Sequence, residues 1–146
     1  AQEQLLRQMI VLVAFIPLLI DTGGDVGCQS STVVIRGLNT QNIRQHGIFW
    51  LVRREALAGA LLGIILGFGA VAWAYLLQGN LLVAVVVGIS LLLISILATV
   101  LGATLPLLFS YWGLDPALMS APFVTTIADV FGVLIYFYVA RWILLF

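Results

Sequence analysis

Four long apolar stretches restrict the folds that this chain can adopt. An α-helix needs about 20 apolar residues to cross about 30 Å of hydrocarbon, and three of the stretches reach that length. The first is too short unless its helix continues through a run of glycines toward Ile35. We therefore expect an all-α integral membrane protein with four transmembrane helical segments, the first interrupted by a Gly-rich break. The stretches are approximately Leu5 to Ile20, Leu57 to Leu77, Leu81 to Phe109 and Ala117 to Phe146.

The composition supports a membrane protein and argues against several other classes. Hydrophobic residues make up 63% of the chain and charged residues 8%, whereas soluble domains carry about 25% charged residues. Six arginines balance six acidic residues and there is no lysine, so no basic surface is expected to attract nucleic acid. A single cysteine, Cys28, cannot form an intrachain disulfide and is expected to be a small packing residue. We expect residues 1–146 to form one transmembrane domain.

The arginines predict the orientation of the spans. Arg36, Arg44, Arg53 and Arg54 lie between the first and second spans, while the next connection, residues 78–80, carries no charge. Because positively charged loops stay in the cytoplasm, the loop over residues 38–55 is predicted to be cytoplasmic. The protein is then a multi-pass protein of the plasma (inner) membrane. At the start of the second span, Arg53, Arg54 and Glu55 are expected to be anchors that reach the membrane surface.

Asp129 is the most informative residue within the spans, since it falls near the middle of the fourth. A carboxylate at this depth costs about 2.5–3.5 kcal/mol on insertion scales, so it needs compensation. Small and polar side chains share its helix face, and this stripe could line water. The alternative is a protonated Asp129, or one that is hydrogen-bonded in a packed interface. The residues on this face are Thr125, Thr126, Gly132, Val133 and Tyr136.

The segment "IPLLIDTGGDVGCQSSTVVIRGL", residues 16–38, predicts an unwound helix. Pro17 cannot donate a hydrogen bond to the carbonyl of Val13, and Gly23, Gly24 and Gly27 disfavour a regular helix. Free carbonyls are expected to result, and unwound transmembrane helices present such oxygens to cations.

Carboxylates in the same segment add to this set of oxygens. Asp21 and Asp25 stand four residues apart, and calcium and magnesium prefer carboxylate, carbonyl and water oxygens. A phosphate-binding loop would want a basic residue beside the glycines, and an EF-hand loop would end in a glutamate; neither is present. The remaining alternative is a structural turn in which Asp21 caps the next helix.

The same residues resemble a known family. The segment above, together with "DPALMSAPFVTTIADVFGVLIYF", is similar to the membrane domain of the MgtE family of magnesium channels. That family's pattern reads approximately P-L-L-x-x-T-G-G-N-x-G-x-Q-S-S and later D-P-A-x-x-S-x-P-x-x-T-x-x-D. The similarity covers nearly all of the chain, but the family's first span and its cytosolic domains have no counterpart here. We therefore expect either a fragment or part of a longer precursor.

The resemblance implies a homodimer with a central pore lined by the first and last spans of this chain. It implies that Asp129 is the pore aspartate and that the carbonyl of Thr125 is a backbone ligand to the ion's water shell. This sequence departs from the pattern at Asp25, where the family has asparagine, and at Cys28, where a small polar residue is common. The extra carboxylate makes divalent-cation permeation a firmer expectation than magnesium specificity.

The residues and the resemblance together give one site prediction. We expect Asp129, Thr125, Asp21, Asp25 and Gly24 to bind Mg²⁺ as the transported ion, with no organic cofactor. A two-fold axis down the pore would bring two copies of Asp129 to one divalent ion. Besides a second copy, expected partners are membrane lipid and a regulatory cytosolic domain or other membrane subunits, but not nucleic acid.

Three functions stay open. The first is a divalent cation channel, the second is a cation-coupled carrier or exchanger, and the third is an accessory or structural subunit of a larger membrane complex. An enzyme is not expected, because no nucleophile, base and orienting group form a recognisable set and His46 lies in a polar loop. Gly59, Gly63 and Gly67 repeat every four residues and are expected to allow close helix packing.

Overall fold

Long helices account for nearly all of the described chain, residues 2–40 and 46–145 of a computed structural model. Within these residues there are five helices and no strand. α1 and α2 follow one another closely enough to count as one span, Gln2–Asn39, so four segments are long and apolar enough to cross a membrane. The four-span prediction is confirmed. The helices are α1 (Gln2–Ala14), α2 (Ile16–Thr40), α4 (Ile48–Gln78), α5 (Leu81–Tyr111) and α6 (Pro116–Leu144).

The first span is interrupted at Phe15 and not at its glycines. The N–H of Phe15 donates to the carbonyl of Leu12 at 3.2 Å, a tighter turn than an α-helix makes, and regular helix resumes at Ile16. The cause is Pro17, which has no N–H to donate to Val13 and clashes with that turn. α2 then continues without a break to Thr40. The prediction of unwound backbone with free carbonyls at the glycines is therefore wrong.

In a membrane, the helix has a lower free energy than an unwound conformation for the glycine segment. A glycine weakens a helix by about 1 kcal/mol relative to alanine. An unpaired backbone group in hydrocarbon costs several kcal/mol, so unwinding would lose more than it gains. Glycine also allows close approach here: a Cβ on Gly23 would lie 2.6 Å from Cγ2 of Ile94, and one on Gly27 would lie 2.5 Å from Cγ1 of Val124. The glycines thus bring α2 against α5 and α6.

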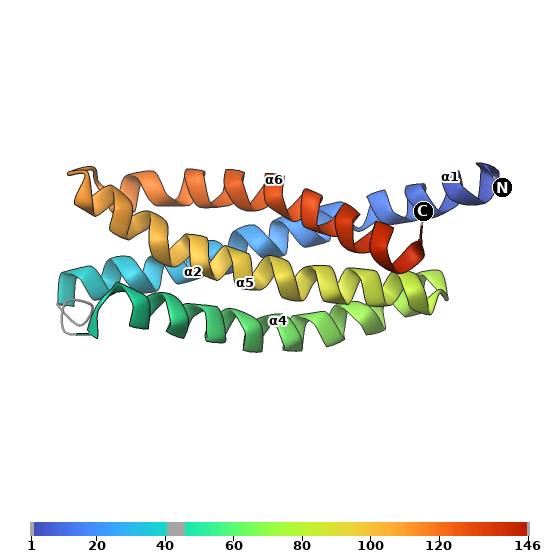
Figure 1. Cartoon of the computed structure of the whole chain (residues 1–146), viewed down its shortest axis with the longest axis horizontal. Helices are drawn as coiled ribbons and strands as arrows, with labels where there is room; N and C mark the ends of the chain where they lie inside the picture. Colours follow the sequence, from blue (N-terminus) through green and yellow to red (C-terminus); the bar gives the residue numbers. More distant parts are fainter. Residues whose placement is uncertain (1, 41–45, 146) are drawn as a thin grey trace.

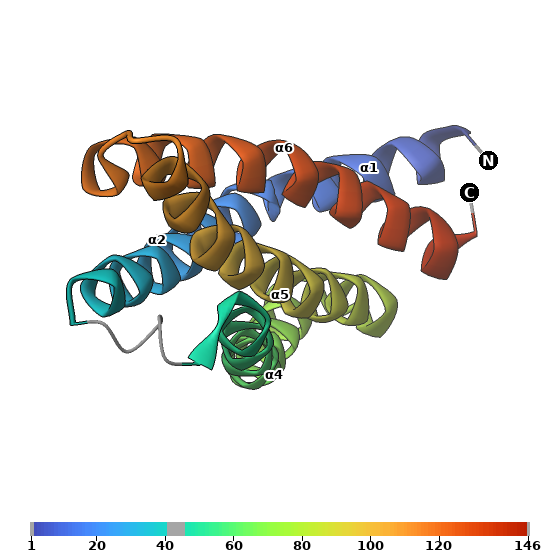
Figure 2. The same ribbon diagram turned by 60° about the vertical axis from the view of Figure 1, so that its left-hand side comes forward.

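α5 is the central helix of the bundle, and it contacts α2, α4 and α6 (Figure 1). The view in Figure 2 shows α2 and α6 crossing on one side of α5, with α4 on the other. The turn between α5 and α6 lies at the same end of the bundle as the end of α2 and the start of α4 (Figure 1). Asp115 caps α6 in that turn by accepting a hydrogen bond from the N–H of Ala117 at 3.0 Å.

The glycines of α4 form its contact with α5. Gly59, Gly63 and Gly67 are all buried. A Cβ on Gly63 would lie 3.0 Å from the Cα of Leu92, and one on Gly67 would lie 3.1 Å from the carbonyl oxygen of Gly88. The prediction that these glycines allow close helix packing is confirmed.

Glu55 does not reach the membrane surface as expected. It is only 7% exposed, and its carboxylate lies 2.7 Å from the hydroxyl of Ser30 on α2. Arg53 and Arg54 are exposed, and the Arg54 guanidinium lies 5.3 Å from the ring centre of Trp50. The anchor prediction is thus wrong for Glu55, because its place on α4 faces the neighbouring helices.

Candidate functional site

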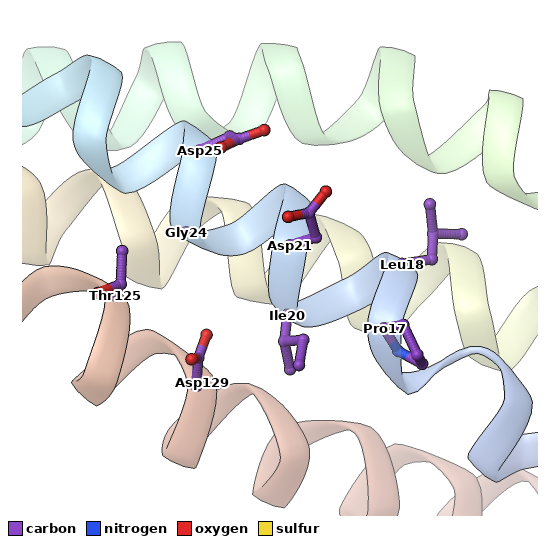
Figure 3. Close-up of a pocket in the computed structure, with 8 residues that line it drawn as sticks. All are labelled: Pro17, Leu18, Ile20, Asp21, Gly24, Asp25, Thr125 and Asp129. Carbon is purple, nitrogen blue, oxygen red and sulfur yellow. The ribbon is translucent and has the colours of Figure 1, made fainter.

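A pocket of about 580 Å³ lies between α2 and α6 (Figure 3). We call it the α2–α6 pocket. α2 contributes Pro17, Leu18, Ile20, Asp21, Gly24 and Asp25, and α6 contributes Thr125 and Asp129. All five residues predicted from the sequence as cation ligands line this one pocket. The structure therefore brings the two motifs together, although they stand about 100 residues apart in the chain.

The α2 wall carries two exposed carboxylates, Asp21 and Asp25, which lie one helical turn apart on one face. Gly24 is buried between them, and a Cβ there would lie 3.5 Å from Cγ2 of Thr125. Because Gly24 lies within continuous helix, it provides a close approach to α6 and not the free carbonyl that the sequence predicted.

The α6 wall carries Thr125 and Asp129, also one turn apart. Both side chains point from α6 toward α2 in Figure 3. The Thr125 hydroxyl lies 3.0 Å from the carbonyl of Ala121 and 3.1 Å from that of Pro122, so its proton is donated to the helix backbone. The backbone carbonyl of Thr125 lies within α6, and a helical carbonyl keeps a second lone pair that can accept from water. The arrangement can therefore offer oxygen atoms to a hydrated ion.

The three carboxylates of the pocket have no protein partners within the part of the chain that the structure describes. Asp21, Asp25 and Asp129 accept no hydrogen bond and form no ion pair with residues 2–40 or 46–145. Unpaired charge at membrane depth is costly and marks water-filled cavities and ion pathways. The α2–α6 pocket is therefore a candidate site for a cation or for water.

A single chain does not build a closed metal cage. Over the described ranges no group of three or more histidine, cysteine, aspartate or glutamate side chains is close enough together to hold a bare ion. A cation that enters the α2–α6 pocket would meet carboxylates on both helix walls that do not form such a group. A site of this kind suits an ion that keeps its water molecules.

The stripe around Asp129 is shorter than the sequence predicted. Gly132 is buried, with a Cβ there 3.6 Å from Cδ1 of Ile94, and Tyr136 is fully buried. The prediction that these two residues line water is wrong, because this part of α6 packs on the core of the bundle.

Tyr136 has a role that the sequence analysis missed. Its hydroxyl donates to the carbonyl of Leu12 at 2.8 Å. That carbonyl belongs to the turn that Pro17 interrupts, where helical hydrogen bonds are lost. The Leu12 carbonyl also accepts from the N–H of Phe15 in that turn, so Pro17 predicts an irregular turn here but not the hydrogen bond from Tyr136.

Comparisons with known proteins match the chain to one family. The profile of the MgtE family, described as divalent cation transporter, matches residues 16–139. A magnesium transporter MgtE of Thermus thermophilus is 42% identical over 97% of this chain and 31% of its own length. Proteins of the same name from Bacillus subtilis and Enterococcus faecalis are 34% and 33% identical, each over 94% of this chain and 31% and 30% of their own lengths. The chain thus spans about a third of the length of these relatives.

Proposed function

Because the chain belongs to the MgtE family of divalent cation transporters, we propose that it conducts divalent cations across a membrane through the α2–α6 pocket. Mg²⁺ is the first candidate ion, since the relatives that the chain matches are named magnesium transporters. The observation that carries the proposal is the set of three unpaired carboxylates, Asp21, Asp25 and Asp129, on the walls of one pocket. The assignment of these residues, with Thr125 and Gly24, to ion binding is part of the proposal.

The pocket suits a hydrated magnesium ion. Mg²⁺ gives up water reluctantly and demands octahedral geometry, with ligands at about 2.0–2.1 Å. In our proposal the ion keeps its water molecules, which donate hydrogen bonds to Asp129 and to the Thr125 carbonyl. A pocket of about 580 Å³ has room for the ion together with its water. Binding through water is also weak enough for the ion to leave, as conduction requires.

We further propose that two copies of the chain form the complete pore. One Asp129 carries a single negative charge, whereas a divalent ion carries two. A two-fold axis beside the pocket would place a second Asp129 across the passage and balance the charge. The exposed positions of Asp21 and Asp25 on the pocket's rim leave that side of α2 available to a second copy.

The proposed orientation places the connection between α2 and α4 in the cytoplasm of a plasma (inner) membrane. Arg36 near the end of α2 and Arg53 and Arg54 near the start of α4 are exposed. The end of α2 and the start of α4 lie at the same end of the bundle (Figure 1). The turn between α4 and α5, Gly79 and Asn80, has no charge. This asymmetry supports a cytoplasmic location of the arginines. A regulatory cytosolic domain, elsewhere in a longer protein, is a further proposed partner.

A cation-coupled carrier is the second candidate. The interruption between α1 and α2 at Phe15 favours it, because carriers often bind their ions near discontinuous helices. A carrier would use the same carboxylates, but its flux would saturate and depend on a counter-ion.

Flux into liposomes tests the proposal. The protein is reconstituted and the uptake of Mg²⁺, Ca²⁺, Na⁺ and protons is measured for the unmodified protein, for Asp129→Asn and for Glu3→Gln. Glu3→Gln removes a charge of the same kind from an exposed position on α1. We expect divalent flux to fall more than about tenfold in Asp129→Asn, since a loss of about 1.4 kcal/mol already has that effect.

Each result of this experiment has a distinct meaning. Unchanged divalent flux in Asp129→Asn would refute the proposed pathway. Saturable flux that requires a counter-ion gradient would favour the carrier. No flux with any ion, from correctly folded protein, would indicate an accessory subunit and reject both transport proposals.

A further inference from the structure

A second pocket, of about 380 Å³, lies at the end of α6. It is lined by Tyr138, Arg141, Trp142 and Leu145, and we call it the Arg141 pocket. Tyr138 follows Asp129 by about two and a half helical turns, so the two side chains project from opposite faces of α6. The Arg141 pocket is therefore separate from the α2–α6 pocket.

The face of α6 that carries the Arg141 pocket is not covered by other parts of the described chain. Tyr138 and Trp142 are each 75% exposed, and Phe131 and Leu134, nearer the middle of the helix, are exposed as well. The opposite face of the same turns is buried, since Ala140 belongs to the core of the bundle. Lipid acyl chains are as apolar as these exposed side chains. In a membrane, an acyl chain is the natural neighbour of this face.

The depth of Arg141 suits a lipid headgroup. It lies about 18 Å along the helix axis from Asp129, which is near the middle of the span. Half of the hydrocarbon thickness is about 15 Å, so Arg141 reaches the polar layer of the membrane. Tyr138 and Trp142 beside it are of the two residue types that are enriched at this depth, because their rings are apolar and carry a polar O–H or N–H group.

The charge of the Arg141 pocket favours an anionic lipid. The guanidinium forms no ion pair with any residue that the structure describes, and none of the side chains that line the pocket is acidic. A guanidinium binds phosphate oxygens through charge-assisted hydrogen bonds. A zwitterionic lipid would also bring a cationic group, for which the lining has no carboxylate. An anionic lipid brings a single net negative charge, which Arg141 balances.

We propose that the Arg141 pocket binds the headgroup of an anionic phospholipid, in the leaflet at the opposite end of the bundle from the connection between α2 and α4 (Figure 1). Arg141 donates hydrogen bonds to the phosphate, and Tyr138 and Trp142 flank the headgroup. An acyl chain then lies along Leu134 and Phe131. Phe131 and Arg141 are about 15 Å apart along the helix axis, which is the depth of one leaflet.

Quenching of tryptophan fluorescence by brominated lipids tests the proposal. The other three tryptophans of the chain are exposed and can be replaced by phenylalanine, which leaves Trp142 as the single tryptophan; they are Trp50, Trp73 and Trp112. This protein is reconstituted in phosphatidylcholine that contains a small share of brominated phosphatidylglycerol, or the same share of brominated phosphatidylcholine. The ratio of quenching by the two brominated lipids gives the preference of the site for the anionic headgroup.

We expect a preference of about fivefold for phosphatidylglycerol, the effect of one cationic side chain at a membrane surface. Arg141→Gln should lower the ratio to about one, and Arg141→Lys, which keeps the charge, should retain most of the preference. Arg7→Gln is the matched control, because Arg7 is an exposed cation on α1, which lies at the same end of the bundle as the end of α6 (Figure 1). We expect Arg7→Gln to leave the ratio unchanged.

Three results would overturn the inference. The first is a ratio of about one in the unmodified pocket, or a preference that persists in Arg141→Gln. The second is an equal loss in Arg7→Gln, which would show a general effect of surface charge. The third is no quenching by either lipid, which would show that protein, such as a second copy of the chain, covers this face of α6. None of these measurements requires cation flux, so the lipid site and the proposed function stand or fail separately.

Discussion

Gly27 should be one of the least replaceable residues of α2, and Gly27→Ala tests why. A Cβ at this position would lie 2.5 Å from Cγ1 of Val124 and 3.2 Å from the carbonyl oxygen of Ala98. Both contacts are too close, and neither neighbour can move easily. Val124 is fully buried, and its β-branched side chain has one strongly preferred rotamer in a helix. The Ala98 carbonyl is part of the α5 backbone.

The expected loss of stability in Gly27→Ala follows from two opposing contributions to the free energy of unfolding. Overpacking costs about 1–3 kcal/mol. The upper part of this range applies here because the added methyl group would contact two rigid neighbours. Alanine is better than glycine in a helix by up to about 1 kcal/mol, which offsets some of the cost. We therefore expect Gly27→Ala to lower the free energy of unfolding by about 1–2 kcal/mol.

Thermal unfolding in detergent measures this loss, with Gly69→Ala as the matched control. Gly69 lies within α4, and a Cβ there would meet nothing within 4 Å. We expect Gly69→Ala to be neutral or to stabilise by up to about 1 kcal/mol. If Gly27→Ala is as stable as Gly69→Ala, the glycines of α2 are not needed for close packing and our explanation of the continuous helix is wrong.

Three further variants test separate parts of the structure. Tyr136→Phe should lower the free energy of unfolding by about 1 kcal/mol, because it removes the donor to the Leu12 carbonyl; unchanged thermal stability would contradict that role. Asn80→Ala should cost about 1 kcal/mol at the start of α5, where the Asn80 side chain accepts from the N–H of Leu82 at 3.0 Å. Hydrogen exchange at that amide should then accelerate, and an unchanged rate would argue against the cap. Asp25→Asn should raise the Mg²⁺ concentration for half-maximal flux by about two- to fivefold, the effect of one exposed charge; an unchanged value would remove Asp25 from the pathway.

The number and type of the spans could be predicted from the sequence because bilayer thickness sets their length. The conformation inside the first span could not be predicted from residue types alone. Glycine is a poor helix former in water, and that preference predicts a break at Gly23, Gly24 and Gly27. In the structure, two effects outweigh this low helix preference. They are the close contacts with Ile94 and Val124 and the need to pair backbone groups in the membrane. Pro17 did interrupt the helix, since the loss of its N–H does not depend on the surroundings.

The residue types at the candidate site were also predictable. The sequence singled out Asp21, Asp25 and Asp129 because acidic side chains are rare in apolar segments. The structure places them in one pocket, and their role as ion ligands stays a prediction.

The contacts between helices were not predictable from one sequence. The pairs Ser30 with Glu55 and Leu12 with Tyr136 depend on how far each helix is shifted and rotated against its neighbour. Periodicity within a single helix carries no information on that register. This is why Glu55 was expected at the membrane surface and Tyr136 beside water.

Access of water to position 129 tests the central claim most directly. In a Cys28→Ala background, Asp129→Cys and Phe131→Cys are each treated with a charged thiol reagent that does not enter lipid. Phe131 is 50% exposed but lies on the opposite side of α6 from Asp129, so it serves as the control. Our account predicts rapid modification at position 129 and almost none at position 131. Equal, slow modification at both positions would show that Asp129 does not face a water-filled passage, and would contradict the account.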